Sequence, residues 1–492
     1  MMLKNDENNA PADDRLPPGS RSVIAILLAS AFVVILNETT LTVALKWIMD
    51  DLGVTERAAQ WLTTAFMLTM AVIIPVTGWL LERFPTRQVF ILAMALFSAG
   101  TLLVIVSPTF PLVLAGRVVQ ASGTAVMMPL LMTTIMNVVP QSRRGAMMGN
   151  ISMVISVAPA LGPTVSGLVL QFANWRVIFM IVLPLAILLG VFGALRIRSL
   201  NEPRDVPVDA VSIGLAIVGF GGLVYALSLI GVEGGSVAQL AGVLVLGLAS
   251  LVAFLWRQVI LGRSGGALLN LDTFRHPGFR IALTVVAIAM AALFGTLIML
   301  PLILQNALGM QPLTVGLVLL PGGLVMGILG PTVGKLYDRV GPRPLVIPAC
   351  LLIGAVLFGL STISVSTSPW FIVACHVAMS VGFAFMFTPL LTTALGSLPR
   401  ALYPHGSATM GTVQQLAGAI GTAVFVTIYA TQTRIAADKG IEERVAMLTG
   451  SRLAFLAAAG VWALGFIGSW WLRRPSAEAH TTVEPVGDRV SN

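Results

Sequence analysis

The sequence GWLLERFPTR at residues 78–87 returns as GKLYDRVGPR at residues 334–343. The glycine, the acidic residue, the arginine that follows it and the final arginine each recur 256 residues further along the chain. A glycine lets the chain turn tightly, and an acid with arginines can join neighbouring helices by charge-assisted hydrogen bonds. The duplication therefore predicts two related halves, each with a loop that can lock or release its neighbours.

Composition places these loops in a membrane protein. Hydrophobic residues make up 57% of the chain and charged residues 10%, which excludes a soluble globule. Apolar runs of about 20 residues recur from end to end, the length that an α-helix needs to cross a bilayer. Because only helices and closed barrels satisfy every backbone group in lipid, and these runs are too long for barrel strands, we predict an all-α membrane protein.

The apolar runs predict fourteen spanning helices, arranged as six, two and six, with the two inserted helices between the duplicated halves. The expected parts are a cytoplasmic tail, a six-helix half, a linker with the two inserted transmembrane helices, a second six-helix half and a cytoplasmic tail, at residues 1–20, 21–200, 201–275, 276–474 and 475–492. Parallel halves around a central cavity are typical of membrane transporters that bind substrate near the midplane.

The distribution of basic residues predicts the orientation. An even number of spans puts both termini on one side, and most of the 29 lysines and arginines face the cytoplasm if that side is cytoplasmic. We therefore expect a multi-pass protein of the cytoplasmic (inner) membrane with both termini in the cytoplasm. The net charge of +8 belongs to these loops and does not indicate a nucleic-acid partner. On the other side, Thr431–Arg452 is expected to be the largest loop, with a small surface helix.

Residue types with catalytic or metal-binding chemistry are scattered along the chain. The four histidines form no metal-ligand pattern, and Cys350 and Cys375 lie in apolar segments without ligand spacing. No nucleophile and base pair is evident, nor any glycine and lysine loop that grips nucleotide phosphates. The sequence predicts no metal site, no cofactor and no enzyme, and it disfavours a pump driven directly by ATP.

Glu38 lies deep inside the span-length apolar run from Ser22 to Leu45. Ionisable residues in such runs are costly and normally face a protein interior or a water-filled cavity, where they work. Arg117 is the basic residue within a span, and both side chains lie about seven residues, or roughly 10 Å, from the outer ends of their helices. A change in their separation could load and release a proton. A static structural ion pair is the alternative interpretation.

Several motifs resemble the 14-helix drug:proton antiporter branch of the major facilitator superfamily, over about residues 20–475. The two repeated loops are similar to its cytoplasmic loop motif, although Glu82 replaces the usual aspartate and Pro85 the usual glycine. The segment Leu112–Gly123 resembles its helix 4 arginine motif. The segment Ala158–Gly167 resembles the helix 5 motif associated with antiporters, with Ser166 where a glycine is common.

Helix 1 departs from the branch in an informative way. Many members carry an aspartate where this chain has Asn37, and here the acid comes one place later, at Glu38. This variant is most similar to lincomycin-resistance and related multidrug exporters. The resemblance implies the major facilitator fold, with two six-helix halves and two inserted helices, and it favours export over import.

Four sets of candidate residues follow. The proton-coupling pair is Glu38 and Arg117. The conformational switch loops contain Gly78, Glu82, Arg83, Arg87, Gly334, Asp338, Arg339 and Arg343, for which ordinary loop charge is the alternative. The antiporter helix seam, a close helix contact that could seal against proton leak, contains Gly162, Pro163 and Gly167, for which simple packing is the alternative. The substrate cavity is expected to contain Asn37, Thr40, Gln120, Thr124, Met127, Gln305, Gln414 and Gln415.

The function expected is proton-coupled export of amphipathic drugs or toxic compounds by alternating access, with the proton gradient as energy source. The expected partners are the lipid bilayer, a small amphipathic substrate and protons. The oligomeric state is left open, and a monomer is compatible with the sequence. A dedicated exporter of one endogenous metabolite, lipid or peptide is the alternative, because it would share the coupling residues and differ only in the lining of its cavity.

Overall fold

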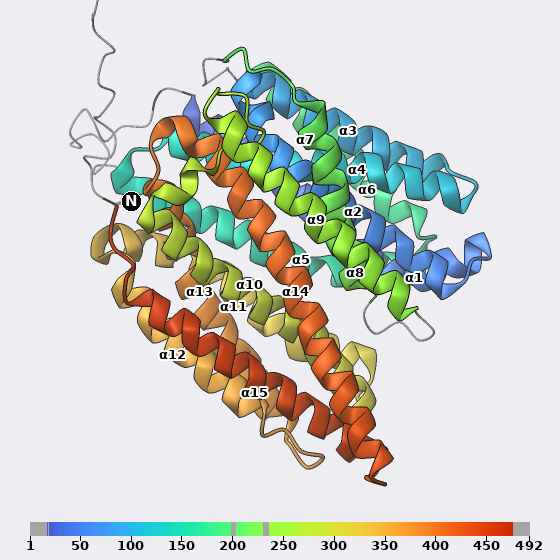
Figure 1. Ribbon diagram of the computed structural model, residues 1–492. Helices are drawn as coiled ribbons and strands as arrows, with labels where there is room; N and C mark the ends of the chain where they lie inside the picture. Colours follow the sequence, from blue (N-terminus) through green and yellow to red (C-terminus); the bar gives the residue numbers. More distant parts are fainter. Residues whose placement is uncertain (1–16, 18, 198–202, 230–235, 476–492) are drawn as a thin grey trace, which may run out of the picture.

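A computed structural model describes residues 17, 19–197, 203–229 and 236–475, and all regular structure in these ranges is helical. Fourteen helices in the described residues are long and apolar enough to cross a membrane, as predicted. In Figure 1 the helices lie close together at the end that carries the N-terminal label and spread apart toward the opposite end.

The first half contains six spanning helices. They are α1 (Ser20–Leu52), α2 (Glu56–Arg83), α3 (Thr86–Val106), α4 (Phe110–Val138), α5 (Arg144–Phe172) and α6 (Arg176–Arg196). Local chemistry sets their ends: α1 stops at Gly53, whose φ of 62° is left-handed, and the Thr55 side chain accepts a hydrogen bond from Ala58 N–H to begin α2. A short 3₁₀ turn, η2 (Gln141–Arg143), precedes α5.

The inserted pair forms a second unit. Its first span consists of α7 (Ala210–Ala216), the π-turn η3 (Ile217–Gly221) and α8 (Gly222–Ser228), and its second span is α9 (Val237–Gly262). Asp209 caps α7 through Ser212 N–H. In Figure 1 the pair, in green, lies beside α2 and α14, and η3 and α8 pack on α2.

The second half contains six further spans. They are α10 (Pro277–Leu302) with the π-turn η5 (Ile303–Ala307), α11 (Pro312–Val340), α12 (Arg343–Leu360), α13 (Pro369–Gly396), α14 (Tyr403–Asp438) and α15 (Glu443–Ser469). Two 3₁₀ turns, η4 (Leu271–Arg275) and η6 (Arg400–Leu402), precede α10 and α14. The large loop expected at Thr431–Arg452 is wrong, because α14 and α15 extend into it and only residues 439–442 connect them. The two helices continue beyond the apolar core, and most of the charged residues of this segment lie at their ends or in the short connection.

The two halves meet through α5 against α11 and α2 against α14. Along the first pair, Gly145 lies on Gly334, and Gly149 lies so close to Gly330 that an added Cβ would overlap its carbonyl oxygen. The contact continues to Ala160, whose Cβ would lie only 2.6 Å from a Cβ added on Gly323.

The same register ends beyond that point. Gly167 of α5 and Gly316 of α11 continue this register toward the other end of the two helices. A Cβ added to either glycine would have no atom of another described residue within 4 Å. We call the end with residues 78–87 and 334–343 the loop end, and the opposite one the far end. The halves are therefore joined at the loop end and apart at the far end.

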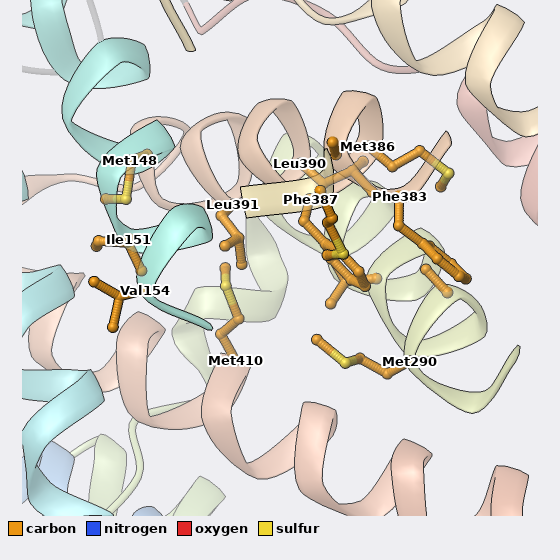
Figure 2. Packing of buried hydrophobic residues seen from close by; sticks show 14 of the residues in the cluster. Met148, Ile151, Val154, Met290, Phe383, Met386, Phe387, Leu390, Leu391 and Met410 are labelled. Carbon is orange, nitrogen blue, oxygen red and sulfur yellow. The ribbon is translucent and has the colours of Figure 1, made fainter. Parts of the chain in front are cut away.

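Apolar side chains fill the joined region. Figure 2 shows Met148, Ile151 and Val154 of α5 on one side, while Leu391 of α13 and Met410 of α14 point toward each other beside them. All five are buried in one cluster that draws on both halves. Such packing excludes water from the space between the halves at this depth.

Candidate functional site

Glu38 lies on α1 and is half-buried. Among the described residues, no hydrogen bond or ion pair of its carboxylate is present, and its electrostatic partner is Arg117, which attracts it without direct contact. The two opposite charges that the sequence singled out are thus close enough to attract each other, while their role in proton coupling stays a prediction. The direct ion pair that served as the alternative interpretation does not occur in this structure.

Arg117 is 1% exposed on α4 and is held by neutral groups. Its Nη1 donates to Gln120 Oε1 at 2.5 Å, and Gln120 Nε2 donates to Thr101 Oγ1 of α3 at 2.7 Å. The guanidinium carbon lies 4.1 Å from the centre of the Phe66 ring of α2, a cation–π contact. Nε of Arg117 has no hydrogen-bond partner in the described part of the chain. A buried guanidinium with a vacant donor retains the capacity to bind an acceptor.

Asn37 is the second buried polar group beside Glu38. It is fully buried, and neither polar atom of its side chain has a hydrogen-bond partner among the residues that the structure describes. Thr40 is also fully buried, but its hydroxyl donates to the Asn37 carbonyl oxygen at 2.9 Å. Asn37 therefore carries unused donors and acceptors next to the acid, whereas Thr40 is satisfied within its own helix.

The residues predicted to line the cavity occupy different environments. Gln120 is fully buried in the Arg117 network, Thr124 donates to the Gln120 carbonyl oxygen, and Met127 is in the hydrophobic core. Gln305 is exposed in η5, while Gln414 and Gln415 are half-buried on α14. The structure therefore does not bring the eight residues to one surface. Those on α4 pack inward in this structure, and a role of any of the eight residues in substrate binding stays a prediction.

The helix 5 seam is tight at one position. An added Cβ on Gly162 would collide with Thr39 of α1, so this glycine permits the close approach of α5 to α1. Pro163 is exposed, and Gly167 has no neighbour within 4 Å of an ideal Cβ. The close contact thus rests on Gly162 and does not extend to Gly167. A role in preventing proton leak stays a prediction.

In the second switch loop, Asp338 joins the halves. Its carboxylate accepts hydrogen bonds from Gly145 N–H at 2.8 Å and Ala146 N–H at 2.9 Å, at the start of α5. Carboxylates are favoured at helix N-termini because the N–H groups there are unpaired and the helix dipole is positive. Arg339 and Arg343 are exposed, so the acid rather than the arginines makes the contact between halves.

The first switch loop uses more partners. Glu82 accepts from His405 Nε2 of α14 at 2.9 Å, and it pairs with Arg204 of the linker at 3.4 Å. Arg83 pairs with Asp205 at 2.8 Å, which ties α2 to the linker. Arg87 Nε donates to the Ala194 carbonyl oxygen at 2.7 Å, within the first half.

Sequence reasoning missed a buried group at the loop end. Arg144 is 4% exposed; it donates to the Met136 and Val139 carbonyl oxygens at the end of α4, and to the Tyr403 hydroxyl of α14 at 3.1 Å. In the sequence Arg144 is one of the many basic residues between apolar runs, with nothing that marks it as buried. Hydroxyl pairs also cross between the halves: Thr133 with Ser407, and Ser152 with Thr388, each at 2.7 Å. The sequence feature that the two segments share is a proline before each 3₁₀ turn, Pro140 before α5 and Pro399 before α14.

Two six-helix halves that meet at one end, with opposite charges on two of the spans, are typical of a membrane transporter. The chain belongs to the Major Facilitator Superfamily, whose sequence pattern matches residues 27–422. It is thus a multi-pass membrane transporter and not an enzyme, as the sequence predicted.

Known relatives agree over nearly the whole length. The chain is 39% identical over 458 residues to the Lincomycin resistance protein LmrB of Listeria monocytogenes, covering 92% of this chain and 96% of that protein. It is 38% identical over 463 residues to the uncharacterized MFS-type transporter YcnB of Bacillus subtilis, covering 94% and 97%. The crystal structure of the human organic anion transporter MFSD10 shares the fold with a TM-score of 0.64 at 15% identity, covering 92% of this chain and 100% of that one.

Proposed function

We propose that this protein is a proton-coupled exporter of amphipathic toxic compounds, working by alternating access in the cytoplasmic membrane. The observation that carries the proposal is the Glu38 carboxylate, which has no hydrogen-bond partner in the described structure and sits within the attraction of the buried Arg117 guanidinium. A group in this position can exchange a proton for cargo, because its charged form depends on the distance to the guanidinium.

The proposed orientation places the loop end and both termini in the cytoplasm. The arrangement of the halves, sealed at the loop end and apart at the far end, then corresponds to a form that faces outward. In the inward-facing form, protonated Glu38 releases its proton to the cytoplasm and substrate takes its place. After the return to the outward form, protonation of Glu38 accompanies release of the substrate. The proton gradient supplies the energy, so no cofactor is required.

The name of the Listeria relative supports the substrate class, since it ascribes lincomycin resistance to a protein similar along nearly the full chain. Small amphipathic molecules are therefore the first compounds to test. A panel that also contains lipids and peptides separates this proposal from a dedicated exporter, because a single accepted compound would favour the latter.

Glu38→Gln tests the coupling directly. In proteoliposomes with an imposed pH gradient, the variant is expected to lose uphill dye export while still exchanging dye across the membrane at equal concentrations, because the neutral amide mimics the protonated acid. Glu56→Gln is the matched control, since Glu56 is exposed at the start of α2 and should export normally. Gradient-driven export by Glu38→Gln at the normal rate would overturn the assignment.

A further inference from the structure

The two switch loops hold the opposite half by different chemistry. The elements that they hold are equivalent by position: Pro140 and Pro399 each precede a 3₁₀ turn of three residues, and α5 and α14 begin directly after these turns. In this alignment Gly145 corresponds to Pro404 and Ala146 to His405.

Proline changes what α14 can offer. Asp338 uses the N–H groups of Gly145 and Ala146, but Pro404 has no N–H, so the same two-bond contact cannot form at α14. Glu82, one methylene longer than aspartate, instead reaches the imidazole of His405, whose Nε2 lies 2.9 Å from Oε2. The imidazole thus takes the place of a missing backbone donor. His405 is 3% exposed, so this contact is shielded from water.

A third segment fixes the tautomer of that imidazole. The backbone N–H of Asn270 donates to His405 Nδ1 at 3.2 Å. Because Nδ1 accepts, the ring hydrogen resides on Nε2 and points at Glu82. Gly78 leaves the space for this arrangement, since a Cβ there would lie 2.8 Å from Nδ1.

The segments on both sides of the inserted pair take part. Asn270 follows α9, while Arg204 precedes α7 and reaches Glu82 with both its backbone N–H, on the carbonyl oxygen at 3.0 Å, and its guanidinium. Both flanks of the inserted helices therefore converge on the contact between α2 and α14.

We propose that His405 is the positioning residue of the gate at the loop end, and that the inserted pair serves the gate by holding this imidazole in the tautomer that donates to Glu82. The inference rests on the proposed alternating access, because a gate has a function only if the loop end opens. It assigns the inserted helices a mechanical role that the twelve repeated helices do not provide.

Asn270 permits a sharp test because its φ of −75° suits proline. Asn270→Pro removes the N–H that fixes the tautomer, whereas Asn270→Ala keeps the N–H and loses only the side-chain bond to Asp272 N–H. The reporter is Ser407→Cys, with Cys350 and Cys375 replaced by alanine, because Ser407 is fully buried where α14 meets α4. A thiol there reacts with a maleimide only when the loop end opens.

His405→Ala is expected to raise the labelling rate on the order of tenfold, the effect of losing one charge-assisted hydrogen bond to Glu82. Asn270→Pro removes a neutral hydrogen bond to the imidazole and should raise the rate several-fold. Asn270→Ala and Thr412→Val, which removes a hydroxyl bonded only within α14, should label at the parent rate. His405→Gln keeps an N–H donor and should restore much of the closure. Glu82→Gln with His405→Ala should label no faster than His405→Ala alone, since the bond between Glu82 and His405 is the one that both changes break across the halves.

Equal labelling of Asn270→Pro and Asn270→Ala would overturn the tautomer role, and parent-like labelling of His405→Ala would overturn the gate role. These measurements need neither substrate nor a pH gradient. Failure of the inference is therefore distinguishable from failure of the proposed proton coupling, which the export assay of Glu38→Gln decides separately.

Discussion

The buried guanidinium of Arg117 depends on an amide for its position. Gln120 accepts from Arg117 through its oxygen and donates to Thr101 through its nitrogen, so the amide cannot rotate without losing both bonds. Thr101 in turn donates to the Phe97 carbonyl oxygen, which leaves its lone pairs for Gln120. The chain of bonds fixes the face of Arg117 that is presented to Glu38.

Thr101→Val tests this chain of bonds. Valine preserves the shape of the side chain and removes the oxygen that accepts from Gln120. The buried Gln120 amide is then unpaired, which should lower the free energy of unfolding by about 1 kcal/mol. Because the amide is then free to turn, gradient-driven export should fall several-fold. Thr101→Ser keeps the hydroxyl and is the control. Export assays and thermal unfolding of the two variants measure the effect, and equal export by valine and serine would show that the amide does not position Arg117.

Sequence reasoning reached these charges through depth alone. Glu38 and Arg117 are recognisable because each interrupts an apolar run, and their distance from the helix ends places them at one level. The helical period also groups Arg117, Gln120 and Thr124 on one side of α4. What it could not reveal is which neighbour that side meets, since burial against α3 depends on how the helices pack. The sequence assigned Gln120 to the substrate cavity, whereas in this structure it is fully buried between Arg117 and Thr101.

At the scale of elements, the inserted pair is held together by an ion pair at its loop end. Arg257 of α9 binds Asp209 through two nitrogens, at 2.6 and 2.7 Å, and Asp209 also caps α7. The Arg257 guanidinium, followed by the Ser212 hydroxyl and N–H, holds the pKa of Asp209 well below its usual range. A bidentate pair of this kind fixes direction as well as distance.

Asp209→Asn is expected to lower the melting temperature of the purified protein by a few degrees, because it removes the charge while asparagine can still cap α7. The pKa of Asp209 is lower in the folded protein than in the unfolded chain, where it is about 4. Its charge therefore stabilises the fold fully at any pH above about 4, and this contribution is lost only as the pH falls through the folded-state pKa. The difference from the parent protein should therefore be the same at pH 5 and pH 8. Asp272→Asn is the control, since its pair with Arg275 is largely exposed and should contribute little. A difference that shrinks between pH 8 and pH 5 would contradict the assignment.

The apolar pattern predicts the spans but not where each helix ends. The spans themselves were predictable because lipid demands a long apolar helix. The extensions of α14 and α15 beyond the apolar core could not be predicted. Charged residues such as Asp438, Glu442 and Glu443 are as compatible with a water-exposed helix end as with a loop. Nor does the sequence show that Gly149 and Gly330 face each other across the halves, since glycine is common throughout membrane helices.

At the scale of the whole molecule, the duplicated loops predicted two halves but not how far apart they stand. In the proposed alternating access, one sequence serves both an inward and an outward form, and two such forms differ in free energy by only a few kcal/mol. The arrangement in this structure, closed at the loop end, is stabilised by the contacts between the halves there. They are made by Asp338, Glu82, Arg144 and the hydroxyl pairs. Each of these contacts must break if the loop end is to open.

A disulfide between Ser152→Cys and Thr388→Cys tests that requirement, because the two hydroxyl oxygens lie 2.7 Å apart on α5 and α13. With Cys350 and Cys375 replaced by alanine, oxidation should hold the loop end shut and reduce export to background, and a reductant should restore it. The single-cysteine variants control for the loss of either hydroxyl.

Gly167→Cys with Gly316→Cys supplies the mirror experiment, since these positions continue the register of α5 and α11 where the helices separate. That pair should not oxidise in this form, and should do so only as the loop end opens. Full export with the Ser152→Cys and Thr388→Cys disulfide formed would mean that cargo crosses without separation of the halves at the loop end, and alternating access would have to be abandoned.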